Sequence, residues 1–143
     1  MRISILSIIL VIVGCGSIHT IIKFQKKGLM KLKMKIPEDY IFEGLQGDQE
    51  VEHRYWYPDS SVIYITSFEN TLNYEDIREQ GTYYNRFKSY HNNDTLTLRG
   101  ISSNGLYWQD KLLKNGVTIG YSKVPKNDLQ DFISAIESIE IFN

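Results

Sequence analysis

The sequence feature that most constrains this chain is an apolar segment that ends just before its only cysteine. Ile3 to Val13 is aliphatic except for two serines. As a helix it would rise about 1.5 Å per residue and cover about half of a roughly 30 Å hydrocarbon core. Arg2 precedes the segment, and Gly14 and Cys15 follow it. Because Cys15 has no second cysteine within the chain, the fold must be held together by packing and hydrogen bonds alone.

The segment resembles the signal of bacterial lipoproteins, with a lipobox that reads Ile12-Val13-Gly14-Cys15. The resemblance implies cleavage between Gly14 and Cys15 and lipidation of Cys15, so that residues 1–14 would be a signal peptide. It also implies a lipid-anchored domain outside the cytoplasm, in the bacterial cell envelope. Gly16 stands where some bacteria carry an Asp for inner-membrane retention, which favours the outer membrane in a cell with two membranes.

Two other interpretations of the apolar segment stay open. Ile18, Ile21 and Ile22 extend it to roughly 20 residues, the length of a transmembrane helix. An uncleaved helix would keep the domain in the cytoplasm, because the lysines that follow outweigh Arg2 in the positive-inside rule. The segment could also be a buried core helix of the domain.

Charge is distributed unevenly along the chain. From Ile36 onward nine Lys and Arg residues stand against seventeen Asp and Glu residues, a net charge of about −8. This acidic part argues against nucleic acid as a partner, because phosphate binding needs a dense cationic surface. The preceding lysines could each add on the order of 1 kcal/mol of attraction to an anionic membrane, or they could be solvated linker and strand-edge residues. They are Lys23, Lys26, Lys27, Lys31, Lys33 and Lys35.

We expect residues 15–28 to form the lipidated N-terminus and a tether, and residues 29–143 to form a single domain, long enough for one hydrophobic core. Lysines alternate with apolar residues from Lys31 to Ile36, as in a half-buried strand. The strongest hairpin signal is Asn115-Gly116, because a type I′ turn needs positive φ at both central residues. Strands are also expected at 51–57 and 61–68, which flank a turn at 58–60, at 95–101, and at 106–114 and 117–123.

Two segments have helical periodicity. Apolar residues from Leu129 to Ile139 fall on one stripe, and Asn127 with Gln130 is placed to form a capping box. A second helix is expected from about 73 to 90, kinked or split at Gly81. The predicted fold is therefore α+β, a mainly antiparallel β-sheet with a mid-chain helix and a C-terminal amphipathic helix packed on it. This order of elements over roughly residues 30–143 resembles the Mog1/PsbP-like fold, without a diagnostic motif.

The sequence contains no pattern typical of covalent, metal or phosphate chemistry. There is no Gly-x-Ser-x-Gly elbow or P-loop, and the histidines at positions 19, 53 and 91 are dispersed. Glu50 and Glu52 would share one face of a strand while His53 takes the other, so they do not converge on a metal. We therefore expect a protein that is not an enzyme and that carries no cofactor and no metal.

Adjacent aromatic residues are the best candidates for a binding site. Neighbouring residues on a strand point to opposite faces, so rings that are adjacent in sequence cannot all lie in one core. Exposed Tyr and Trp suit protein partners and sugars. The alternative is that both faces are covered and these are ordinary core rings. The candidate partner-binding residues are Tyr55, Trp56, Tyr57, Tyr107 and Trp108.

Three hypotheses about function follow. The first is a lipid-anchored cell-envelope protein with a non-enzymatic binding domain for a protein or envelope component, held to the membrane by lipid on Cys15. The second is an immunity-type lipoprotein that inhibits a basic toxin, for which the acidic domain would steer association. The third is a carbohydrate-binding or hydrolytic module built on the aromatic rings.

Overall fold

The computed structural model describes residues 19–26 and 30–142. The predicted signal peptide and Cys15 lie outside the described residues. Within the described part the fold is α+β and mainly antiparallel sheet, as predicted. Its elements are β1 (His19–Lys26), β2 (Met30–Pro37), β3 (Ile41–Gln46), β4 (Val51–Trp56), β5 (Val62–Thr66), α1 (Tyr74–Glu79), α2 (Tyr83–Asn92), β6 (Leu96–Ile101), β7 (Tyr107–Leu112), β8 (Thr118–Val124), α3 (Leu129–Glu137) and β9 (Glu140–Phe142).

The larger sheet has six strands among these residues, in the order β3-β4-β5-β8-β7-β6. All of its neighbouring strands are antiparallel. A hairpin does form at Asn115-Gly116, but its turn is not the expected type I′, because Gly116 has a positive φ of 76° and Asn115 does not. The backbone N–H of Leu113 donates to the oxygen of Val117 at 2.8 Å, and the N–H of Gly116 donates to the oxygen of Leu113 at 3.0 Å. Glycine adopts this conformation without the steric cost that other residues incur.

The smaller sheet has three strands in the described part, in the order β1-β2-β9. Residues 19–26, for which the sequence predicts a tether, form β1 instead, so the predicted domain boundary at residue 29 is wrong. The reason is an alternation that continues across both strands: Ile22 and Phe24 are buried, whereas Lys23 and Gln25 are exposed. Neither β3 nor β9 is predicted from the sequence.

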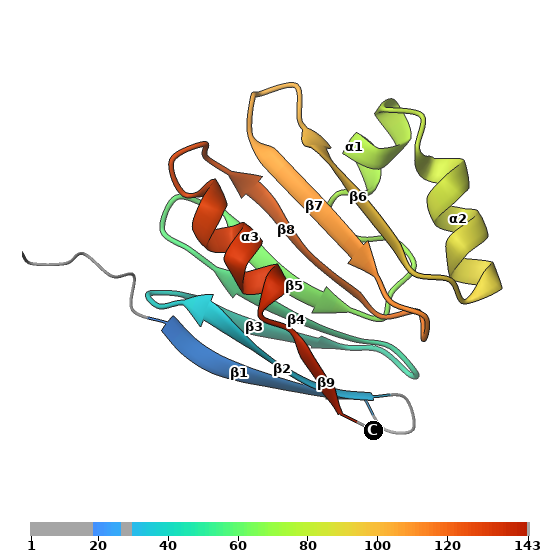
Figure 1. The fold of residues 1–143 in the computed structure, drawn as a ribbon, viewed down its shortest axis with the longest axis horizontal. Coiled ribbons are helices and arrows are strands. Elements are labelled where there is room, and N and C mark those ends of the chain that lie inside the picture. Colours follow the sequence, from blue (N-terminus) through green and yellow to red (C-terminus); the bar gives the residue numbers. More distant parts are fainter. Residues whose placement is uncertain (1–18, 27–29, 143) are drawn as a thin grey trace, which may run out of the picture.

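The elements form layers on the two faces of the six-stranded sheet (Figure 1). The smaller sheet and α3 pack on one face. The main hydrophobic core lies between these two elements and the six-stranded sheet. Helices α1 and α2 contact the sheet at β6 and β7. Both faces of the sheet are thus at least partly covered, so aromatic side chains on either face can be buried.

The helices agree with the sequence in position and differ in one detail of capping. The mid-chain helix is split at Gly81, whose φ is 72°. The expected capping box of Asn127 and Gln130 does not form, because Asp128 is the N-cap of α3 and makes no side-chain capping bond. The backbone N–H of Asp128 donates to Pro125 at 3.1 Å, so a turn delays the start of the helix by one residue.

A buried polar network connects two segments to the six-stranded sheet: the loop that precedes α1, and helix α2. Asp110 on β7 accepts hydrogen bonds from Tyr64, from Thr71 at 2.6 Å and from the amide of Asn73 at 2.8 Å. The guanidinium of Arg86 on α2 lies 3.6 Å from the same carboxylate. Burial, followed by the nearby charge of Asp110, raises the pKa of Tyr64. Most of these buried polar groups find partners in one another, whereas the side-chain oxygen of Asn73 is buried without a hydrogen-bond partner among the described residues.

Candidate functional site

The five candidate aromatic residues do not form one surface. Tyr55 and Trp108 are only 4% and 2% exposed. Tyr55 packs edge-on against Tyr40, with ring centroids 5.1 Å apart, and burial raises its pKa to about 12. Trp108 fills the space beside Gly100 on β6, where a Cβ atom would come within 2.8 Å of the indole. Both residues are too deeply buried for a partner to reach, so the prediction that they bind a partner is not supported.

Two more of the five, Tyr57 and Tyr107, are half-buried and pack against the main core. The hydroxyl of Tyr57 donates to the backbone oxygen of Pro37 at 3.0 Å, and its ring lies edge-on to Phe132 with centroids 5.1 Å apart. Burial raises the pKa of Tyr57. Tyr107 lines a small hollow of about 240 Å³ together with Leu129 and Ile133 of α3. Each ring is therefore partly accessible and structurally engaged.

Trp56 is half-buried and is thus the more accessible of the two tryptophans, and it lies at the end of β4 just before the Pro58-Asp59 turn. Ile41 on the edge strand β3 lies directly opposite it and is 76% exposed. Glu43 and Arg54 form the next pair on the same face of these two strands, two residues further along. We call these four residues, Ile41, Glu43, Arg54 and Trp56, the Trp56 patch.

Polar bonds hold the Trp56 patch in one arrangement. The indole N–H of Trp56 donates to Glu43 at 2.9 Å, and Arg54 lies 3.3 Å from the same carboxylate oxygen. Arg54 also forms an ion pair with Glu52, which is buried. The hydrogen bond from Trp56, together with the charge of Arg54, lowers the pKa of Glu43. An indole fixed in this way has little rotamer freedom left to lose when a partner binds.

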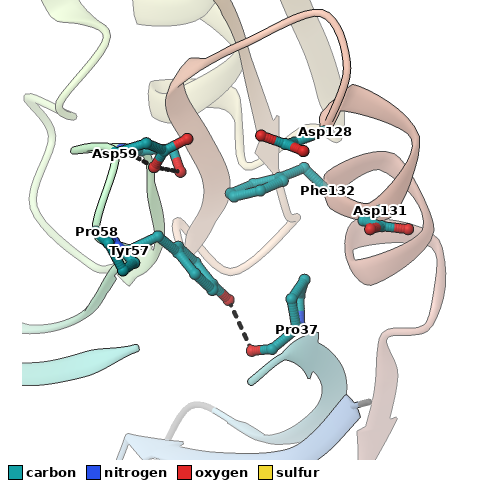
Figure 2. Close-up of a pocket in the computed structure, with 8 residues that line it drawn as sticks. Pro37, Tyr57, Pro58, Asp59, Asp128, Asp131 and Phe132 are labelled. Carbon is teal, nitrogen blue, oxygen red and sulfur yellow. Dashed lines mark hydrogen bonds between the residues drawn. The ribbon is translucent and has the colours of Figure 1, made fainter. Parts of the chain in front are cut away.

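A second recess lies between the β4–β5 turn and the start of α3, with a volume of about 310 Å³. We call it the acidic hollow. Figure 2 shows the rings of Tyr57 and Phe132 side by side in its wall, with Asp59 on the turn side and Asp128 and Asp131 on the helix side. One oxygen of Asp59 accepts the backbone N–H of Ser61 at 2.9 Å. Aromatic walls with carboxylates around them suit a cationic side chain.

Sequence reasoning missed Ile41 and Glu43 because it did not predict β3. It missed the acidic hollow because Asp59 and Asp128 are far apart in sequence and only the fold brings their segments together. The only available signals were Ile41, an apolar residue outside any predicted strand, and the acidic residues at the start of the predicted C-terminal helix.

Within residues 19–26 and 30–142, no three His, Cys, Asp or Glu side chains are grouped closely enough to hold a metal ion. In the same described part, no helix is long and apolar enough to cross a membrane. Comparison with protein-family models, curated proteins and solved structures yields no match to this chain. The resemblances to lipoproteins and to the Mog1/PsbP-like fold therefore stay predictions.

Proposed function

We propose that this chain is a lipid-anchored cell-envelope protein whose α+β domain binds a protein or envelope component without catalysing a reaction. The anchor rests on the sequence Ile12-Val13-Gly14-Cys15. The binding role rests on the Trp56 patch, where a half-buried indole lies opposite an isoleucine that is 76% exposed.

The chemistry of the Trp56 patch supports recognition of a partner. Binding energy at protein interfaces is concentrated in a few residues, among which Trp and Arg are enriched, and these are surrounded by groups that exclude water. Trp56 and Ile41 supply an apolar centre, while Glu43 and Arg54 supply polar groups beside it. Ile41 lies on an edge strand, so a partner can approach it without displacing any part of the described domain.

Photo-crosslinking in intact cells tests the binding role. A photoreactive residue in place of Ile41 should yield a discrete adduct, whereas the same residue in place of the exposed Ser103 should not. Trp56→Ala should weaken the adduct, because a hot-spot residue contributes about 2 kcal/mol or more to binding, which corresponds to about 30-fold in affinity. Its melting curve should stay close to that of the parent protein.

Trp108→Ala provides the matched control for that experiment. A buried tryptophan truncated to alanine costs about 3–5 kcal/mol of stability, so this variant should melt much earlier. An Ile41 adduct that persists undiminished in Trp56→Ala would contradict the proposed site, and so would a loss of stability as large as that of Trp108→Ala.

The anchor has its own test. Cys15→Ala should abolish incorporation of a labelled fatty acid and leave an unprocessed precursor, because the sulfur that receives the lipid is gone. Ser17→Ala, two residues further on, should be labelled and processed like the parent. Equal labelling of the Cys15→Ala and Ser17→Ala variants would refute lipidation at Cys15.

A second candidate function, an immunity-type inhibitor of a basic toxin, is favoured by the acidic hollow. Three carboxylates around two aromatic rings would receive a Lys or Arg side chain of the toxin. Association steered by charge slows steeply as ionic strength rises. If the captured partner is basic and its association with the protein slows in this way, Asp59→Asn combined with Asp128→Asn should slow it further. An association rate independent of salt would exclude this function.

A further inference from the structure

We propose that the outer face of the β1-β2-β9 sheet is a membrane-facing surface that lies on anionic lipid headgroups. This inference rests on the proposed lipid anchor at Cys15 and adds the orientation in which the domain is held. The inner face of the sheet carries buried apolar side chains that belong to the main core. Helix α3 borders the outer face at one end, where Ser134 and Ser138 line a hollow together with Ile21 and Lys35.

The strand register gathers the N-terminal lysines on this outer face. Lys23 on β1 lies directly opposite Lys33 on β2, and Lys31 and Lys35 follow at two-residue intervals on either side. Side chains two residues apart on a strand point to the same face. The alternation of lysine and apolar residues in the sequence thus becomes one basic surface, with Lys23, Lys31 and Lys35 exposed to solvent.

The charge on this face contrasts with the rest of the chain. All seventeen acidic residues of the sequence follow Ile36. On the outer face, Glu140 of β9 lies opposite Lys33 and forms an ion pair with it at 2.7 Å. An acidic domain with one basic face takes a preferred orientation at an anionic membrane, because the lysines are attracted to it and the carboxylates are repelled.

Apolar side chains accompany the lysines on the same face. Phe142 is 41% exposed, and the ammonium group of Lys33 lies 5.2 Å from the centre of its ring. Together with Lys23 and Lys31 these residues line a hollow of about 330 Å³. Ile21, opposite Lys35, is 57% exposed. Lysines around accessible apolar side chains are typical of surfaces that rest in the membrane interface, where ammonium groups meet phosphates and apolar groups meet the acyl boundary.

The length of chain between the anchor and the sheet keeps this face near the membrane. Cys15 lies four positions before His19, the first residue of β1. Four residues span at most about 14 Å when fully extended. A lipid on Cys15 therefore holds one end of β1 within reach of the bilayer surface, and the lysines along the strands then draw the whole face down onto it.

Depth-dependent fluorescence quenching tests this orientation on the full lipid-anchored protein purified from membranes. With Cys15 acylated, a cysteine introduced at exposed Gln25 on the outer face is the one reactive thiol, and it takes a fluorescent probe. Ser103→Cys, in the turn between β6 and β7, carries the same probe far from this face. The protein is reconstituted into phosphatidylglycerol or phosphatidylcholine vesicles that contain lipids with a quencher in the headgroup region.

The Gln25 probe should be quenched in phosphatidylglycerol vesicles and much less in phosphatidylcholine, while the Ser103 probe should be quenched in neither. Substituting Gln for Lys23, Lys31 and Lys35 should abolish the difference, since each lysine near an anionic surface contributes about fivefold to binding. The control variant substitutes Gln for the exposed Lys88, Lys114 and Lys126, which lowers the net charge equally and should change nothing.

Each outcome bears on a definite claim. A protein that floats with the vesicles, but whose Gln25 and Ser103 probes behave alike, overturns the orientation and leaves the anchor standing. Equal quenching at Gln25 in both lipids, or an equal effect of the two lysine variants, likewise overturns the role of the basic face. A protein that carries no acyl group and does not float overturns both the anchor and the inference that rests on it.

Discussion

At the scale of single residues, His53 has a position that couples stability to pH. It lies on β4 between two rings, edge-on to Phe24 of β1 at 5.0 Å and to Phe42 of β3 at 5.2 Å. Its Nδ1 atom is buried and has no hydrogen-bond partner among the described residues. Partial burial lowers the pKa of His53, because the charged imidazolium is solvated less well there than in water.

We predict that the protein loses stability on acidification through protonation of His53. Since the pKa of His53 is lower in the folded state than in the unfolded state, the unfolded chain binds more protons, and stability falls as pH drops below about 6.5, the unfolded value. Denaturant unfolding at a series of pH values between 7.5 and 5.5 measures the slope. His53→Phe and His53→Gln should both flatten it. Slopes parallel to that of the parent would mean that other groups cause the loss.

The sequence does not predict which aromatic residues of the candidate site are buried. Tyr55 and Trp108 look like Trp56 in sequence, since each is a ring within an aromatic pair or triplet on a strand. Because both faces of the six-stranded sheet are at least partly covered, alternation along a strand does not separate inside from outside. Which rings stay accessible depends on where the covering elements end, and that is set by long-range contacts.

At the scale of elements, the buried network around Asp110 fixes α1 and α2 to the sheet. The amide of Asn73 donates at 2.9 Å to the hydroxyl of Tyr64 and at 2.9 Å to the backbone oxygen of Tyr121. It thus connects the segment before α1 with three strands at once. Gly120 lies in the same region, where a Cβ would come within 2.6 Å of the Tyr64 hydroxyl.

We predict that Asn73→Ala costs about 2 kcal/mol or more of unfolding free energy, because each buried acceptor left without its donor costs about 1–3 kcal/mol. Asn92→Ala, at the exposed end of α2, is the matched control and should stay within about 0.5 kcal/mol of the parent. Chemical denaturation of both variants measures the difference. Similar small losses in the two would show that the network contributes little to stability.

Elements with strong local signals were predictable, and those without were not. The Asn115-Gly116 hairpin and the break at Gly81 depend on backbone conformations that the local sequence dictates. Strand β3 carries no such signal, because both of its faces are largely exposed and its residues show no alternation of apolar and polar character. Strand β1 does alternate, but its nearness to the apolar N-terminal segment favoured the interpretation as a tether.

At the scale of the whole molecule, the smaller sheet closes one side of the main core. We predict that a chain beginning at Gly28 does not unfold cooperatively, whereas a chain beginning at Gly16 does. The shorter chain lacks Ile22 and Phe24, and burial of each contributes about 1.5–3 kcal/mol. That loss is large beside a total stability of about 5–15 kcal/mol. Thermal unfolding followed by near-ultraviolet circular dichroism compares the two, and equal midpoints would show that β1 is dispensable.

Strand β9 covers an edge of β2 that is otherwise open. It lies against β2 with Phe142 opposite Lys31, so it completes a sheet whose other two strands were made first. Until β9 pairs with it, β2 has an open edge. Long-range pairing of this kind is slow, and open edges attract other chains. By pairing with β2, the last described strand thus shields that edge from pairing with other chains.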